Sequence, residues 1–150
     1  MHALLFAVCV CLVPMCPKPS QADDAKKQAE LEWARGVADD FLVALRNGDT
    51  RGASGLLTAE YAKSIAGKGS ASDYLDQLHA TSYEATLTGA SIAPDRDEVR
   101  LTGRLESSHA TVVWTSALVL RVVKEKESGR WRVGFVLVGK PESKSVEPKK

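Results

Sequence analysis

Apolar residues recur every three or four positions near the start of this chain and every second position in its second half. In the first part, the repeating apolar residues are Trp33, Ala34, Val37, Ala38, Phe41, Ala44 and Leu45. This spacing is typical of one face of an α-helix and predicts a helix over Asp23–Asn47. Asn47-Gly48 is typical of a helix that ends in the left-handed conformation.

Three shorter helices are predicted before residue 80. The first ends near Leu57, and Thr58 caps the second. The third follows a glycine-rich break at residues 67–70 and begins at Ser72 or Asp73. Helical spacing ends there.

After residue 80 the apolar period becomes two, which indicates strands. The predicted strands cover residues 83–92, 98–106, 110–123 and 130–139. Gly89 falls inside the first of them and predicts a β-bulge. Helices followed by an antiparallel meander define an α+β domain, in which the N-terminal helices pack on one face of a curved antiparallel sheet.

The N-terminal residues have a different character from this domain. Ala3–Val13 is an uninterrupted apolar run of eleven residues, whereas a membrane-spanning helix needs about 20. Ser20-Gln21-Ala22 then supplies small residues where a signal peptidase cuts. We expect residues 1–22 to be a signal peptide, residues 23–139 to be the domain and residues 140–150 to be a disordered tail. The domain would therefore be exported, to a periplasm or to the extracellular space.

All the cysteines of the chain, Cys9, Cys11 and Cys16, lie within this leader. The exported domain would therefore contain neither a disulfide nor a thiolate metal site, and we predict no cofactor and no metal. Lipidation of Cys16 is the alternative to cleavage after Ala22. The bulky Met15 before that cysteine disfavours a lipoprotein.

Charge excludes one class of partner. Residues 1–22 hold one basic residue, Lys18, and no acid, which leaves 19 basic and 19 acidic residues in the rest of the chain. Nucleic-acid binding normally requires a basic surface, so we expect no nucleic-acid partner. We also expect no stable membrane span.

Three segments resemble one family: residues 41–49, which end in Asn-Gly-Asp, residues 57–61, and residues 128–133, which begin Ser-Gly-Arg-Trp. They resemble the nuclear transport factor 2-like (NTF2-like) superfamily, including its SnoaL-like and ketosteroid-isomerase-like members. The resemblance extends over about Glu32–Gly139 and implies a cone, in which a curved sheet wraps around a long helix and often encloses a pocket. That superfamily contains isomerases, cyclases, dehydratases and many non-catalytic modules, so the fold does not decide the function.

If the cone forms, strand alternation predicts which side chains line it. The candidate ligand pocket consists of Phe41, Trp114, Ser116, Trp131 and Phe135. Ketosteroid isomerase uses carboxyl groups and a tyrosine inside its cone. No acid falls on the inner positions of the strands from residue 98 onward, so we predict no catalytic residue. Asp40, His79 and His109 are the remaining candidates, and we interpret them as surface or boundary side chains.

The opposite face of the sheet combines valines and arginines. We predict an interface there, formed by Val113, Ala117, Val119, Val136, Val138, Arg100, Arg104 and Arg121. An apolar centre with an arginine-rich margin is typical of protein interfaces. The alternative is a half-exposed sheet whose arginines form cross-strand ion pairs.

These patterns favour an exported, non-catalytic binding or interaction module that forms a homodimer. Two alternatives stay open: a small-molecule enzyme of the isomerase or cyclase type, and a carrier of a small apolar ligand inside the cone. Another protein could also be the partner. The volume and lining of the cone interior distinguish these hypotheses.

Overall fold

The computed structural model describes residues 21–67, 69–79, 84–95, 97–109 and 112–145. Its helices are α1 (Gln21–Arg46), α2 (Thr50–Gly55), α3 (Ala59–Ala66) and α4 (Ala71–His79). Its strands are β1 (Glu84–Ile92), β2 (Glu98–His109), β3 (Val112–Lys124), β4 (Trp131–Val138) and β5 (Glu142–Ser145). The predicted α+β class is confirmed. Within these ranges, no helix has both the length and the hydropathy that crossing a bilayer requires.

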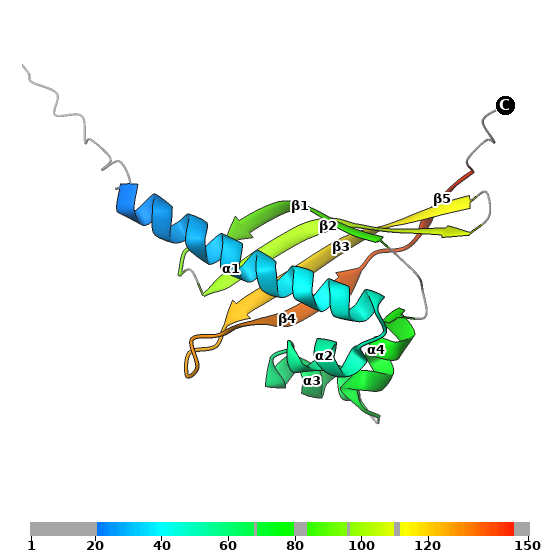
Figure 1. Ribbon diagram of the computed structural model, residues 1–150, viewed down its shortest axis with the longest axis horizontal. Coiled ribbons are helices and arrows are strands. Elements are labelled where there is room, and N and C mark those ends of the chain that lie inside the picture. Colours follow the sequence, from blue (N-terminus) through cyan, green and yellow to red (C-terminus); the bar gives the residue numbers. More distant parts are fainter. Residues whose placement is uncertain (1–20, 68, 80–83, 96, 110–111, 146–150) are drawn as a thin grey trace, which may run out of the picture.

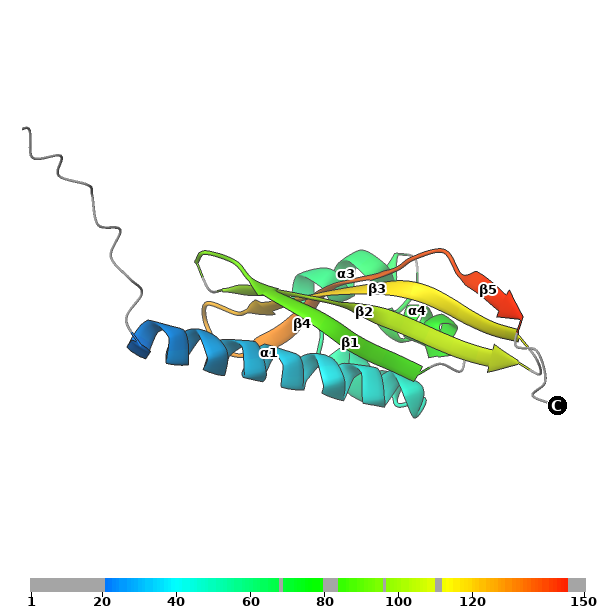
Figure 2. The same cartoon turned by 90° about the horizontal axis from the view of Figure 1, so that it is seen from above.

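The sheet is an antiparallel meander in the order β1-β2-β3-β4, and β5 continues beside β3 where β4 ends. Figure 1 shows α1 running across this curved, open sheet, with α2, α3 and α4 grouped near the C-terminal end of α1. Seen from above in Figure 2, α1 lies along one side of the sheet. We call that side the inner face and the opposite side the outer face.

Local chemistry explains where the helices begin and end. The Asp49 side chain caps α2 by accepting a hydrogen bond from the Gly52 amide at 2.8 Å, and Thr58 caps α3 by accepting one from Tyr61 at 3.1 Å. Gly48, which follows α1, has a φ of 72°, as the predicted left-handed stop requires. Ser70 and Asp73 cap α4 reciprocally, so this helix begins slightly earlier than its sequence pattern predicted.

The core lies between the inner face of the sheet and the helices. Its largest fully buried side chains are Phe41, Leu45, Leu75, Leu101, Leu118, Leu120, Val99, Val122 and Val133. Three come from β3 at alternate positions, which confirms the predicted inner parity of that strand. Trp131 is also buried, with 9% of its surface exposed.

Two β-bulges interrupt the sheet. The first shifts the β1–β2 register between Leu87 and Gly89, as the glycine predicted. The second was not predicted: Arg121 pairs with Phe135 while Val122 pairs with Val133, so Gly134 is an extra residue in β4. One extra residue reverses the facing of every later side chain in the strand.

The inner-face prediction for β4 is therefore wrong beyond Gly134. Val136 is buried on the inner face, whereas Phe135 and Leu137 are 39% and 51% exposed on the outer face.

The C-terminal prediction also needs correction. We expected residues 140–150 to be disordered, but Glu142–Ser145 form β5 and pair with β3 from Thr115 back to Val112. Residues 146–150 lie outside the described part of the chain. The same holds for residues 1–20, so of the expected leader only Gln21 and Ala22 are described, as the first residues of α1.

The free edge of β4 is closed by the segment between α2 and α3. The Thr58 amide donates to the Val133 carbonyl, and the Val133 amide donates to the Leu56 carbonyl, both at 2.9 Å. The Tyr61 hydroxyl accepts a hydrogen bond from the Val136 amide at 3.0 Å and donates one to the Val136 carbonyl at 3.3 Å. The edge-facing backbone groups of Val133 and Val136 are thus satisfied without another strand.

Candidate functional site

Around Phe41 the described side chains nearly fill the interior of the cone. The space there, between the C-terminal half of α1 and the sheet, is about 40 Å³ and is bordered by Phe41, Leu42, Leu45, Leu78, Leu105, Leu118, Val136 and Val138. Small-molecule pockets usually have volumes of about 300–1,000 Å³.

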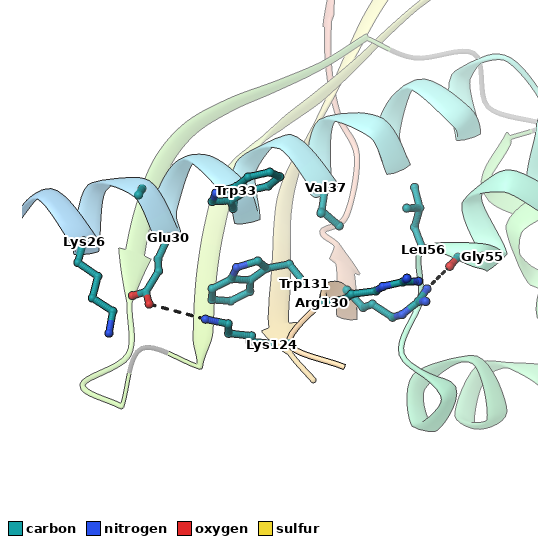
Figure 3. A pocket seen from close by; sticks show the side chains of 12 residues that line it. Lys26, Glu30, Trp33, Val37, Gly55, Leu56, Lys124, Arg130 and Trp131 are labelled. Atoms are coloured by element: carbon teal, nitrogen blue, oxygen red, sulfur yellow. Dashed lines mark hydrogen bonds and ion pairs between the residues drawn. The ribbon is translucent and has the colours of Figure 1, made fainter. Parts of the chain in front are cut away.

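A larger hollow lies outside this core, beneath the N-terminal half of α1. Its volume is about 760 Å³. It is lined by Lys26, Ala29, Glu30, Trp33, Val37, Gly55, Leu56, Lys124, Gly129, Arg130, Trp131 and Arg132. We call it the α1 groove. Figure 3 shows the Trp33 ring beside the helix and the Trp131 ring below it, on the opposite wall.

Glu30 is the buried acid of this groove. Only 8% of the residue is exposed, and its Oε1 atom lies 3.8 Å from Lys124 Nζ, which is close enough for an ion pair but too far for a hydrogen bond. Its Oε2 atom is buried and has no hydrogen-bond partner among the described residues. Lys124 also lies over the Trp131 ring, with Nζ 5.7 Å from the ring centroid.

Four cations line the groove, against this single acid. Lys124 faces Glu30, and Arg132 forms an ion pair with Glu125 at 3.2 Å and donates to the Gly55 carbonyl. The pKa of Glu125 is lowered, first by a hydrogen bond from the Ser128 hydroxyl and then by the charge of Arg132. Lys26 and Arg130 make no ion pair with any residue in the described ranges. The groove is therefore apolar in its middle and cationic around it.

The five predicted pocket residues are not brought together. Phe41 is fully buried in the core, Trp131 lines the α1 groove, and Ser116 is half-buried on the inner side of β3. Trp114 is 41% exposed near the end of β3 that pairs with β5, and Phe135 faces outward because of the Gly134 bulge.

The outer face carries an exposed apolar stripe. The stripe consists of Val113, Ala117, Val119, Phe135 and Leu137, and we call it the outer stripe. Val119 and Leu137 are directly opposite each other on β3 and β4. Among the described elements, α3 borders this face at the β4 edge, where the Tyr61 and Phe135 ring centroids are 6.0 Å apart.

Charged residues flank the outer stripe on β2 and β3. Arg104 pairs with Glu106 at 3.0 Å, and Arg121 lies 3.9 Å from Glu98. Arg121 also lies over the Phe135 ring, at 5.8 Å from its centroid. Arg100 and Arg121 occupy opposing positions on the two strands, which places two like charges side by side.

Six of the eight predicted interface residues lie on this outer face: Val113, Ala117, Val119, Arg100, Arg104 and Arg121. Val136 and Val138 do not, because the bulge turns them inward, and Phe135 and Leu137 take their places. The exchange adds a phenylalanine and a leucine to the stripe and so enlarges its apolar surface.

The three catalytic candidates lie on three different elements. Asp40 is exposed on α1, His79 is the last residue of α4, and His109 is the last residue of β2. The side chains of both histidines are outside what the structure describes. Among the residues that it does describe, no group of three or more His, Cys, Asp or Glu side chains is placed to hold a metal ion.

The α1 groove was missed because Trp33 was assigned to the apolar stripe of the helix. Trp33 is in fact 70% exposed. One signal was available in the sequence: Glu30 lies four residues before Ala34 and eight before Ala38, on the buried face of the same helix. A carboxylate on a buried helical face indicates a specific polar environment.

No protein-family model matches the sequence, and no curated protein matches it. Among solved structures, the chain is similar to an NTF2-like protein of unknown function from Cytophaga hutchinsonii, with 13% sequence identity and a TM-score of 0.45. The match covers 70% of this chain and 88% of that one. It supplies no activity, ligand or partner.

Proposed function

We propose that the protein is an exported, non-catalytic interaction module that associates with a second copy of itself through the outer face of its sheet. The observation that carries this proposal is the outer stripe. Phe135 and Leu137 are both large apolar side chains, and both are more than a third exposed. Contiguous exposed apolar surfaces of this kind commonly mark association sites.

The charges around the stripe favour a second copy as the partner. In a two-fold contact the same surface is present on both sides. This face holds three arginines, Arg100, Arg104 and Arg121, together with the acids Glu98 and Glu106. Opposite charges of two copies can therefore meet at the margin of the contact, where they favour the correct register. An acidic side chain from the second copy would offset the repulsion between the positive charges of Arg100 and Arg121.

The small space around Phe41 supports this proposal over the two alternatives at that position. An isomerase or cyclase, or a carrier that uses the cone, needs room for a ligand inside it. The space of about 40 Å³ beside Phe41 is far smaller than the pockets that hold such molecules, and the α1 groove is a separate site that holds a single, ion-paired acid.

Sedimentation velocity tests self-association. We expect the unmodified protein to be a dimer at micromolar concentration and Leu137→Glu to be a monomer with an unchanged circular dichroism spectrum. The new carboxylate would have to be buried without a partner in the dimer, which is unfavourable. Val43→Glu is the matched control, because Val43 is 46% exposed on α1, away from the sheet, and should leave the dimer intact.

Two results would contradict the proposal. The unmodified protein would sediment as a monomer even at high concentration, or Val43→Glu would dissociate the dimer as effectively as Leu137→Glu.

A further inference from the structure

We propose that the α1 groove binds a small aromatic carboxylate that carries an O–H or N–H donor at the end opposite its carboxylate. This site is separate from the outer face, so the inference does not depend on self-association. It follows from three features of the groove: its two indole rings, its unsatisfied acid and its excess of cations.

The two tryptophans define the shape of the ligand. Trp33 and Trp131 line the same hollow from α1 and β4, and Figure 3 shows their rings on opposite walls. Val37 and Leu56 extend the apolar surface beside them. A flat aromatic body that enters between these walls can stack on indole and lose its contact with water. The volume of about 760 Å³ accommodates a molecule with two fused rings.

Glu30 defines the polar group at one end. Its Oε2 atom is buried without a hydrogen-bond partner among the described residues, and its Oε1 atom is 3.8 Å from Lys124. A buried acceptor without a donor is costly, and a ligand hydroxyl or N–H would supply the missing hydrogen bond. A ligand carboxylate at this position would be repelled.

Arg130 defines the group at the other end. It lies on the far side of Trp131 from Glu30 in Figure 3 and has no ion-pair partner in the described ranges. Its planar guanidinium binds a carboxylate with two parallel hydrogen bonds. Lys124 and Arg132 are already paired with Glu30 and Glu125, and the charge of Arg130 also acts on Glu125 without an ion pair between them. Lys26 is the other cation of the lining that has no ion pair among the described residues. Arg130 and Lys26 therefore favour an anionic group at this end of the ligand.

The probe is 6-hydroxy-2-naphthoate, which has the hydroxyl and the carboxylate at opposite ends of two fused rings. We expect isothermal titration calorimetry of the protein, in the form that its host produces, to show one saturable site. 6-Methoxy-2-naphthoate lacks the donor, and 2-naphthol lacks the carboxylate. Each should bind about tenfold more weakly, because each loses one charge-assisted hydrogen bond.

Variants locate the site. Trp33→Ala and Arg130→Ala should each weaken binding of 6-hydroxy-2-naphthoate by about tenfold. Both residues are exposed in the free protein, so neither change should affect folding. Trp114→Ala and Lys27→Ala are the matched controls: both side chains are exposed, neither lines the groove, and binding should stay within about twofold.

Three results would overturn the assignment. The first is no saturable binding of 6-hydroxy-2-naphthoate, or equal binding of its methoxy analogue. The second is tighter binding of decanoate that persists in Trp33→Ala, which would indicate an alkyl-chain ligand. The third is dissociation of the dimer by Trp33→Ala, which would mean that a second copy covers the groove. Sedimentation of Leu137→Glu tests self-association separately, since that substitution should leave naphthoate binding unchanged.

Discussion

Tyr61 connects a helix to the backbone of a strand that is 75 residues away. Its hydroxyl both donates to and accepts from Val136 in β4, and its ring packs near Phe135. Burial raises the pKa of Tyr61 above its ordinary value of 10.0, and the hydrogen bond with Val136 opposes this increase. One phenol therefore influences both the closure of the sheet edge and the alkaline stability of the protein.

Tyr61→Phe should lower the free energy of unfolding by about 1–3 kcal/mol, because the Val136 amide would lose its partner in a buried position. Chemical denaturation measures this change. Hydrogen exchange at the Val136 amide should become faster in the same variant. Unchanged exchange at that amide would mean that the phenol does not protect the edge.

The raised pKa of Tyr61 also predicts a pH dependence. The folded state holds the phenolic proton more tightly than the unfolded state, whose pKa is near 10.0. The resulting stabilisation is fully present below pH 10.0 and is lost as the pH rises through the higher folded value. Tyr61→Phe should therefore show a smaller loss of stability above pH 10 than the unmodified protein.

At the scale of single elements, the helices were the most predictable part of the chain. Their caps are local, since Asp49 and Thr58 each satisfy an amide three residues away. The parity of β2 and β3 followed from simple alternation. Alternation failed for β4 because of its bulge at Gly134. The bulge depends on how β4 aligns with β3, and this alignment cannot be read from the sequence of either strand alone.

The first bulge yields a test of backbone packing. A Cβ on Gly103 would fall on the Thr86 carbonyl oxygen and 3.0 Å from Leu87 Cα, both of which belong to the backbone of β1. Gly103→Ala should therefore destabilise the domain by about 1–3 kcal/mol.

Gly89→Ala is the matched control, since its new Cβ would meet mainly the Thr102 hydroxyl, a side-chain atom that can rotate away. It should cost less than about 1 kcal/mol. Thermal unfolding compares the two variants, and equal losses would mean that the β1–β2 backbones are not as close as described.

The candidate sites were less predictable than the elements. Alternation placed Val113, Ala117 and Val119 on the outer face, but the residues that enlarge the stripe depend on the second bulge. The exposure of Trp33 also depends on tertiary structure, because a side chain on an apolar helical stripe is buried only where another element meets it. The N-terminal half of α1 meets the sheet across a hollow.

At the scale of the whole molecule, the expected cleavage after Ala22 is compatible with the fold. It would remove only Gln21 and Ala22 from the described part of α1, and both are exposed. Asp23 and Asp24 would then stand at the new helix start, where their charges complement the helix dipole.

We predict that the protein recovered from its native host has the intact mass of a chain that begins at Asp23. Mass spectrometry measures this directly, and the full-length chain, expressed without export, provides the reference mass. An exported product that still begins at Met1 would contradict the prediction, and added lipid mass on Cys16 would replace it with a lipoprotein.

The closed edge of β4 determines what kind of polymer this sheet can form. Filaments that grow by strand addition need two open edges on every molecule, one to receive a strand and one to offer it. Here Leu56, Thr58 and Tyr61 form hydrogen bonds with the backbone of β4. The edge strand β5 is short and carries the charged residues Glu142 and Lys144. Among the described strands, β1 is the long edge that stays open, so edge pairing by itself would join two single chains and then stop. The Leu137→Glu variant, which should not pair through the outer face, should accordingly form no fibres even when it is concentrated.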